Sequence, residues 1–389
     1  MRALCWEGVG KLAVTEVPDP EIRTPGDVIV RVRASSVCGS DLHLINGYLP
    51  AMRQGDILGH EFMGEVVEVG PQVRKHKVGD RVVVGSVVAC GGCWYCRTEQ
   101  YSLCDNGNPQ PNLTEKLWGH SPAGILGYSH AVGGYAGSHA EFIRVPFADV
   151  GAFAVPEGVP DTSAVFASDA MPTGWMAADF CGLTGGEVVA VWGAGGVGQM
   201  AARSAQLLGA ERVIMIDRFS DRLSTAADRI GVETIDYERT DVLDALREMT
   251  GGRGPDACIE AVGMEAHDTG PAYAYDRVKQ AVRAQTDRPT AVSQAIMACR
   301  KGGTVSIVGV FGGFVDKFPL GAAMNKALVL RMGQMHAQRY IPMLLDRLAA
   351  GEMDPGYLAT HPMPLAEGVR GYEMFEKKQD GCLRSVLRP

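Results

Sequence analysis

The chain has 389 residues, of which 46% are hydrophobic and 21% are charged, and its formal net charge is −8. This length and composition predict two soluble domains with separate cores, and the acidic balance without a Lys/Arg cluster excludes a nucleic-acid-binding protein. Because the chain has neither a signal-like N-terminus nor an apolar run of membrane-spanning length, we expect a cytoplasmic protein that has no membrane partner.

Strand-like segments dominate the chain up to about residue 155. They are short, alternate in polarity or are rich in β-branched residues, and are separated by Gly, Pro and Asp, which is typical of strands joined by turns. The expected strands are residues 28–33, 64–70, 81–84 and 141–145. We therefore predict a mostly antiparallel β domain that carries a long Gly-, Pro-, Asn- and His-rich surface loop at residues 106–138.

From about residue 156 the pattern changes to apolar strands that are each followed by a helix. Alternating strands and helices predict an α/β fold with a doubly wound parallel sheet of the Rossmann type. Its buried strands are expected at residues 187–192, 212–217, 257–262 and 304–309. A polar segment at 264–289 is expected to be an insertion in this domain.

The tail of the chain mixes helical and strand patterns, with a helix expected at 341–350 and a last strand at 383–387. We expect this tail to return to the first domain. The predicted domains are therefore residues 1–155 together with 315–389, and residues 156–314.

Four cysteines lie in one Gly-punctuated segment with C-x2-C-x2-C-x7-C spacing, which is that of a closed tetrathiolate zinc site. Four thiolates complete a tetrahedron and leave no position for a substrate, so the predicted role is structural. A redox-active Cys-x-x-Cys pair is the alternative, and the third and fourth cysteines argue against it. The predicted ligands are Cys90, Cys93, Cys96 and Cys104.

A second set of metal-binding side chains precedes this segment, with Cys38 in Cys-Gly-Ser-Asp-Leu-His and the pair His60-Glu61 farther on. A thiolate, an imidazole and a carboxylate supply three ligands and leave one position open, as a catalytic zinc requires. Taken singly, a Cys or a His is more often a packed interior residue. Their place before a tetrathiolate segment and a nucleotide domain favours zinc, with Cys38 and His60 as the first candidates.

A glycine-rich turn follows the apolar strand at 187–192 and opens a helix, which is the context of a dinucleotide-binding fingerprint. The glycines let the backbone approach a pyrophosphate at the helix N-terminus. Asp217, at the end of the next strand, can accept hydrogen bonds from the ribose hydroxyls, which favours NAD over NADP, whereas the adjacent Arg218 could accommodate a 2′-phosphate. A glycine turn without a cofactor is the alternative. The turn residues are Gly193, Gly195, Gly196, Val197 and Gly198.

These motifs, in this order, resemble the zinc-containing medium-chain alcohol dehydrogenase family over essentially the whole chain. The resemblance implies a GroES-like catalytic domain joined to the Rossmann domain. It also implies that Cys38 and His60 bind the catalytic zinc, that Glu61 binds it in some states, and that Ser40 and His43 relay a proton from the substrate to solvent.

The third zinc ligand differs among members of that family. Many have a second Cys before a Thr-Gly turn, whereas this chain has Asp169 in Ser-Asp-Ala-Met-Pro-Thr-Gly. In this respect it resembles bacterial secondary-alcohol dehydrogenases and glutathione-independent formaldehyde dehydrogenases, and a carboxylate ligand makes zinc a harder Lewis acid. A carboxylate that only stabilises a helix N-terminus is the alternative.

The two insertions, 106–138 and 264–289, also resemble the formaldehyde dehydrogenases, in which the long loop covers the adenine side of a tightly held cofactor. The family resemblance further implies that Arg222 contacts the adenosine ribose, unless it forms only a surface ion pair. Positions that line the nicotinamide site, or pack in the core, are Thr173, Val262 and Val308.

The sequence thus predicts an enzyme with two zinc ions per chain that transfers hydride between NAD and an alcohol or hydrated aldehyde, formaldehyde being one candidate. A polyol, amino-alcohol or secondary-alcohol dehydrogenase using NAD(P) is the first alternative. A non-catalytic, zinc-stabilised nucleotide-binding protein is the second. The resemblance implies a homodimer or homotetramer, and the substrate pocket is expected to be lined by residues 48–50, Trp94, the 106–138 loop and residues 311–314.

Overall fold

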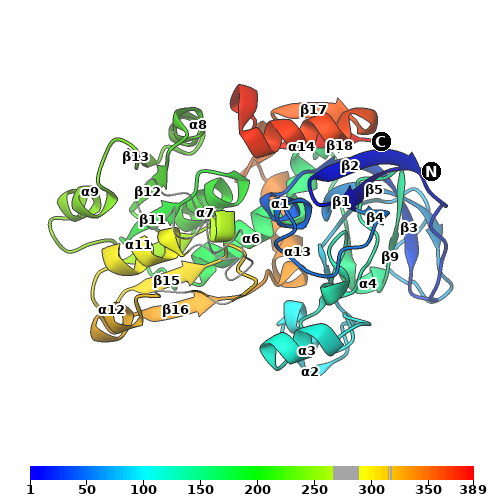
Figure 1. Cartoon of the computed structure of the whole chain (residues 1–389), viewed down its shortest axis with the longest axis horizontal. Helices are drawn as coiled ribbons and strands as arrows, with labels where there is room; N and C mark the ends of the chain where they lie inside the picture. Colours follow the sequence, from blue (N-terminus) through cyan, green and yellow to red (C-terminus); the bar gives the residue numbers. More distant parts are fainter. Residues whose placement is uncertain (266–288, 314, 316–317) are drawn as a thin grey trace. The chain divides into compact units, whose positions relative to one another are not determined.

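The computed structural model describes residues 1–265, 289–313, 315 and 318–389. Most of the insertion expected at 264–289, and Phe314, lie outside the described residues. The chain divides into two compact units, which are residues 1–172 with 335–389, and residues 173–334 (Figure 1). Within the described ranges, no helix is long and apolar enough to cross a membrane.

The first unit is built on three β-sheets, as the strand pattern of its sequence predicts. Its seven-stranded sheet has the order β10-β6-β5-β3-β18-β17, with β9 also pairing with β3, and only β17 and β18 run parallel. These strands are β3 (Val28–Ser36), β5 (Glu61–Val69), β6 (Arg81–Val84), β9 (Phe142–Val145), β10 (Ala152–Ala154), β17 (His361–Pro364) and β18 (Ser385–Arg388). The smaller sheets contain β1 (Arg2–Gly8), β2 (Lys11–Glu16) and β4 (Asp56–Ile57), and β7 (Val87–Val88) with β8 (Gly124–Ile125).

Short helices surround these sheets. α14 packs against β17, β18 and β2, and its Tyr372 and Phe375 share a hydrophobic core with Leu42 and Leu44 of α1 (Figure 1). A second core, which includes side chains from β3, β5, β6, β9 and β10 of the large sheet, contains Phe62 and many valines. The helices of this unit are α1 (Gly39–Ile45), α2 (Trp94–Arg97), α3 (Asn112–Trp118), α4 (Ala148–Gly151), α5 (Asp161–Ala164), α13 (Ala337–Ala349) and α14 (Gly368–Lys377).

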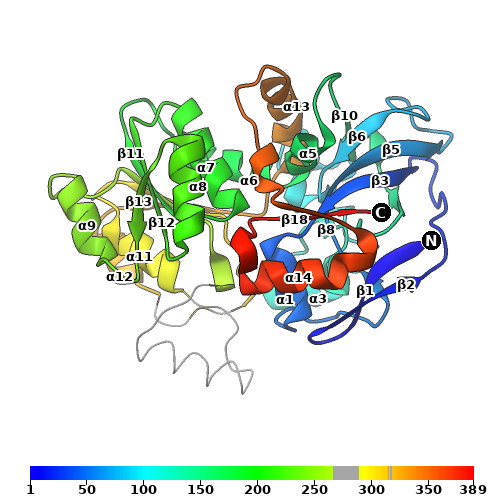
Figure 2. The same cartoon turned by 90° about the horizontal axis from the view of Figure 1, so that it is seen from above.

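The second unit is the predicted doubly wound domain. Its six parallel strands have the order β13-β12-β11-β14-β15-β16, and helices cover both faces (Figure 2). The strands are β11 (Val188–Trp192), β12 (Arg212–Asp217), β13 (Glu233–Asp236), β14 (Ala257–Glu260), β15 (Thr304–Ile307) and β16 (Val329–Met332). One core contains side chains of α6 (Ala170–Asp179), α7 (Gly196–Leu207) and α8 (Ser220–Ile230), and the other those of α9 (Val242–Met249), α11 (Thr290–Ala298) and α12 (Leu320–Asn325).

The borders between the units fall later in the chain than the sequence analysis expected. They lie at 172/173 and 334/335, against expected borders at 155/156 and 314/315. Residues 165–168 are fully buried and pack against β3, β5 and β6 of the first unit, and the first three of them are apolar. Val329–Met332 pairs with β15 as a sixth strand of the parallel sheet and therefore belongs to the second unit.

The segment 106–138 is not simply the surface loop that was expected. It contains α3 and β8, and several of its apolar side chains, among them Leu126, Tyr128 and Val132, are buried in the cores of the first unit. Its high Gly, Pro and Asn content favoured a loop, but burial of these side chains fixes it against the β-sheets.

Candidate metal centres and nucleotide site

Cys38, His60 and Asp169 are brought together from three separate elements. Cys38 follows β3 and precedes the first residue of α1, His60 precedes β5, and Asp169 stands between residues 165–168 and α6. All three are buried. Asp169 Oδ2 lies 3.5 Å from Cys38 Sγ and 3.4 Å from His60 Nε2, and the three ligand atoms lie within 4.8 Å of one another.

These separations fit a single tetrahedral zinc ion. With ordinary zinc–ligand bond lengths, an oxygen ligand lies about 3.6 Å from a sulfur ligand and about 3.4 Å from a nitrogen ligand. The local charge agrees, because Cys38, Asp41, Glu61 and Asp169 gather in an interior where Arg384 is a buried cation. Burial opposes a proton on His60, yet Asp41 and Asp169 outweigh it and raise the pKa of His60 well above its usual value. A divalent cation would balance this concentration of acidic side chains.

Asp41 fixes the orientation of His60, a candidate zinc ligand. Its Oδ1 lies 3.0 Å from His60 Nδ1, and its Oδ2 accepts a hydrogen bond of 2.9 Å from the Cys38 amide. A carboxylate on one ring nitrogen of a ligand histidine leaves the other nitrogen for the metal. The sequence analysis assigned no role to Asp41, although its position three residues after Cys38 is that of a capping-box side chain.

Glu61, predicted as an occasional ligand, lies outside the three-residue cluster. Its Oε1 accepts a hydrogen bond of 2.9 Å from the Ala170 amide, and its Oε2 lies 3.7 Å from Arg384 Nη1. Burial raises the pKa of Glu61 to about 7, Arg384 acts against this, and Asp169 adds to it. Binding of zinc by Glu61 stays a prediction. Arg384 was missed, because no local pattern relates it to residues more than 300 positions earlier.

The predicted relay residues both lie on α1. Ser40 Oγ is 3.2 Å from His60 Nε2, so the hydroxyl is beside the ring nitrogen that faces Asp169. His43 is buried rather than at the surface, and burial lowers its pKa to about 4 although Asp41 acts in the opposite direction. His43 is therefore a neutral imidazole at neutral pH, and its relay role stays a prediction.

Tyr128, from segment 106–138, is a further neighbour that the sequence analysis did not single out. Its ring meets that of His60 edge-on at 5.9 Å, and its hydroxyl donates a hydrogen bond of 3.2 Å to the Ser40 carbonyl. The segment that was predicted to cover a cofactor thus forms part of the wall around His60.

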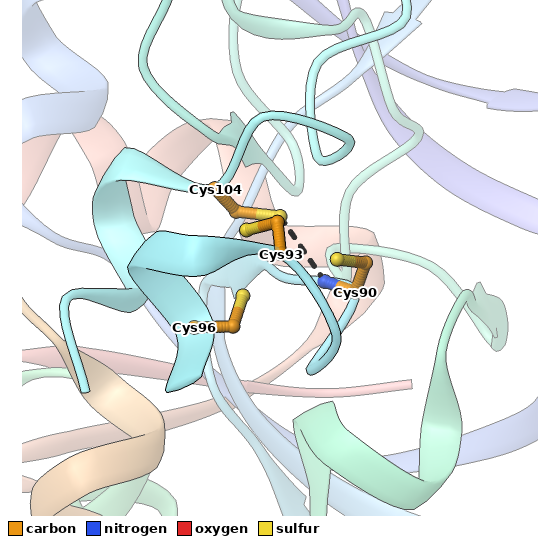
Figure 3. Close-up of side chains that lie close together, drawn as sticks. All are labelled: Cys90, Cys93, Cys96 and Cys104. Carbon is orange, nitrogen blue, oxygen red and sulfur yellow. Dashed lines mark hydrogen bonds between the residues drawn. The ribbon is translucent and has the colours of Figure 1, made fainter. Parts of the chain in front are cut away.

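The four-cysteine segment folds into a compact lobe in which the sulfur atoms face a common space (Figure 3). Cys93 Sγ and Cys104 Sγ are 3.9 Å apart, against about 3.8 Å for two thiolates on a tetrahedral zinc. Burial acts to raise the pKa of Cys90, but hydrogen bonds from the Asn106 side chain and the Gly92 amide lower it to about 6. Amide donors around a thiolate are typical of a structural zinc site.

The glycine turn joins β11 to α7 as predicted. Gly193 has a φ of +99°, and a Cβ on Gly198 would lie only 1.8 Å from the Gly193 carbonyl oxygen, so glycine is required at both positions. Asp217 Oδ2 accepts a hydrogen bond of 2.6 Å from the Ala194 amide, which ties the end of β12 to the turn.

The remaining predicted nucleotide residues lie around the same end of the sheet. Arg222 is buried, stacks over Phe219 at 5.3 Å and reaches to within 3.9 Å of a Cβ built on Gly195. Val262 follows β14 and lies beside Gly193, and Val308 follows β15. The carboxyl ends of parallel strands are where this fold binds ligands. Thr173, in α6, is the first residue of the second unit.

Comparison with known proteins agrees with both parts of the chain. Residues 24–157 match the alcohol dehydrogenase GroES-like domain, and residues 196–277 match the zinc-binding dehydrogenase family. The chain is 38% identical to the uncharacterized zinc-type alcohol dehydrogenase-like protein AdhB of Bacillus subtilis, with all of both chains covered. It is 31% identical to the glutathione-independent formaldehyde dehydrogenase of the same organism, with 97% of this chain and 94% of the relative covered.

Among solved structures, the alcohol dehydrogenase TADH from Thermus sp. ATN1 matches with a TM-score of 0.84 and 36% identity, covering 100% of this chain and 99% of that one. Sequence, fold and the two clusters of metal-binding side chains lead to the same assignment. The chain belongs to the zinc-type, medium-chain alcohol dehydrogenase family of oxidoreductases.

Proposed function

We propose that this chain is an NAD-dependent dehydrogenase that oxidises an alcohol or a hydrated aldehyde at a zinc ion held by Cys38, His60 and Asp169. The observation that carries the proposal is the meeting of three ligand atoms within 4.8 Å of one another, with Asp169 Oδ2 3.5 Å from Cys38 Sγ and 3.4 Å from His60 Nε2. Three protein ligands would leave the fourth position of a tetrahedral zinc to the substrate. Bound zinc would lower the pKa of a substrate hydroxyl, and bound NAD would accept the hydride.

The chain's own residues have distinct tasks in this reaction. Asp41 orients His60, and the Asp169 carboxylate makes the ligand set harder than one with a second thiolate. Ser40 Oγ, at 3.2 Å from His60 Nε2, is placed to accept the substrate's hydroxyl proton. His43, which is neutral and lies on α1 with Ser40, can then accept a proton from the relay. Tyr128 packs edge-on against the His60 ring and would keep water from that side of it.

Two observations in the second unit support NAD over NADP. Asp217 is fixed at the end of β12 by the Ala194 amide, and its charge would repel a 2′-phosphate. Arg218 is the side chain that a 2′-phosphate would need, but its guanidinium lies over the Phe219 ring at 4.7 Å and 3.4 Å from Glu238.

Formaldehyde hydrate is our first candidate substrate, because the chain has Asp169 as third ligand and its relative in Bacillus subtilis is a glutathione-independent formaldehyde dehydrogenase. The test is NADH formation across alcohols, polyols and aldehydes, with formaldehyde supplied without a thiol. We expect turnover with NAD, and a kcat/KM at least ~10-fold lower with NADP. Absence of turnover with both nucleotides would favour the non-catalytic, zinc-stabilised nucleotide-binding protein instead.

We also propose a homo-oligomer, a dimer or tetramer, joined through β16. This strand ends the order of the described parallel sheet, and Val329 and Met332 on it are 49% and 58% exposed. Leu320 and Met324 of α12 add exposed apolar surface beside it. An open strand edge with apolar side chains favours pairing with a second copy.

The oligomer can be tested by placing a charge on this edge. Met332→Lys should convert the oligomer to monomers in light scattering coupled to size-exclusion chromatography, because it would bury an unpaired ammonium group. Val78→Lys, at a 61% exposed site in the first unit, is the matched control and should leave the mass unchanged. A wild-type monomer, or an unchanged Met332→Lys oligomer, would rule out this interface.

A further inference from the structure

A row of buried polar side chains extends from the Cys38–His60–Asp169 cluster into the interior of the first unit. Beyond His60 and Asp41 it contains His139, Ser35 and Ser138, and all of these side chains are almost completely buried. His139 Nε2 lies 3.9 Å from Asp41 Oδ2, and His139 Nδ1 lies 2.8 Å from Ser35 Oγ. Ser35 Oγ is in turn 2.7 Å from Ser138 Oγ.

His139 also packs directly on the backbone that carries the ligand histidine. A Cβ built on Gly59 would lie 2.5 Å from His139 Nδ1, so the ring occupies the space that the glycine leaves. The His139 amide donates a hydrogen bond of 2.9 Å to the Leu58 carbonyl, and the Ser138 amide donates one of 2.9 Å to the Gly59 carbonyl. His139 thus contacts both the backbone beside His60 and the carboxylate behind it.

The charge and tautomer of His139 decide how its ring can act on Asp41. Burial lowers the pKa of His139 to about 4, although Asp41 opposes this, so the ring is neutral and carries one N–H. Because the Asp41 carboxylate can only accept, the N–H is favoured on Nε2, the ring nitrogen nearer Asp41, and Nδ1 then accepts from the Ser35 hydroxyl. A separation of 3.9 Å is longer than a hydrogen bond, but a dipole–charge attraction at this distance is strong where water is absent.

We propose that His139 is a positioning residue for the catalytic metal: it fixes Asp41 and the Gly59–His60 backbone, and so sets how tightly the Cys38–His60–Asp169 site holds zinc. The inference rests on the proposed function, because it presumes that this cluster binds zinc. Outer groups that orient a ligand histidine typically change metal affinity by ~10- to 100-fold when they are removed. Neither metal cluster includes His139, so its effect must act through Asp41 and His60.

The test measures loss of zinc to a chelator from the zinc-loaded full chain, which requires no turnover. His139→Leu keeps much of the ring's volume but removes the N–H, and it should release one of two zinc ions ~10- to 100-fold faster than wild type. His139→Gln places an amide N–H near the position of Nε2 and should remain within about threefold of wild type. A residue that only fills space would give the opposite order, with Leu closer to wild type than Gln, and that order would overturn the inference.

Two further variants keep the result interpretable. In a Cys38→Ser background only the four-cysteine zinc remains, and His139→Leu should not change its release. If His139→Leu does not fold, Ser35→Ala tests the same row of side chains. It removes the hydroxyl that contacts the His139 ring and should speed release of the catalytic zinc by at least about threefold. An unchanged release rate would overturn the inference. Wild-type protein that holds only one zinc would instead refute the proposed function, and two zinc ions with wild-type release from His139→Leu would refute this inference alone.

Discussion

Replacement of Cys38 by Ser is expected to lower kcat/KM by at least ~10³-fold, which corresponds to about 4 kcal/mol of lost transition-state stabilisation. In the proposed site the Cys38 thiolate is one of three ligands. A serine hydroxyl is a poor zinc ligand at neutral pH, so the remaining imidazole and carboxylate would hold the ion weakly. The measurement is NADH formation by purified variant and wild type at equal folded concentration, which circular dichroism establishes.

Cys5→Ser is the matched control, because Cys5 is a buried thiol of the same unit that accepts a hydrogen bond from Thr15 and belongs to neither metal cluster. This control should retain most of its activity. A Cys38→Ser variant that turns over at the wild-type rate would contradict the assignment of the catalytic metal.

Replacement of Cys104 by Ala is expected to remove the other zinc and to destabilise the first unit by several kcal/mol, because binding of a structural zinc contributes directly to folding. Cys104 is buried beside Cys96, and the lobe's core includes Val87, Ala89 and Ala123. Without the metal, the three remaining thiols and their amide donors would hold this small core together poorly. Differential scanning calorimetry with zinc analysis should show a lower Tm and one zinc ion lost.

Cys382→Ala provides the comparison for that variant. Cys382 is buried in another core of the same unit and lies outside both metal clusters, so its truncation should cost about 1 kcal/mol and no zinc. Equal losses of stability and unchanged zinc content in the two variants would show that the four-cysteine lobe is not a metal site.

The sequence predicted those parts of the site whose residues lie close together in the chain, or which follow directly from a strand and its turn. Four cysteines within one loop and a glycine turn after β11 are local patterns, and the structure brings the members of each together. Cys38 and His60 were predicted from their ligand chemistry and their place in the chain, and antiparallel pairing of β3 with β5 brings them near each other. Asp169 was predicted from family resemblance.

The missed residues come from pairings that no local pattern encodes. Arg384 reaches Glu61 because β18 pairs with β3, and His139 reaches Asp41 because residues 137–139 bond to the backbone of 57–59. Segment 106–138 was predicted as a surface loop because its Gly and Pro content is high. Its few apolar residues that are buried are not spaced with the period of a helix or a strand. Tertiary pairing, and not local propensity, decides these positions.

We propose that one chain holds two zinc ions of different kinds, one bound by four thiolates and one left open to substrate. Elemental analysis of purified protein after dialysis tests it most directly, with wild type and Cys38→Ser measured side by side. We predict two zinc ions per chain in wild type and one in Cys38→Ser. A single zinc ion in wild type, with the same content in Cys38→Ser, would contradict the account.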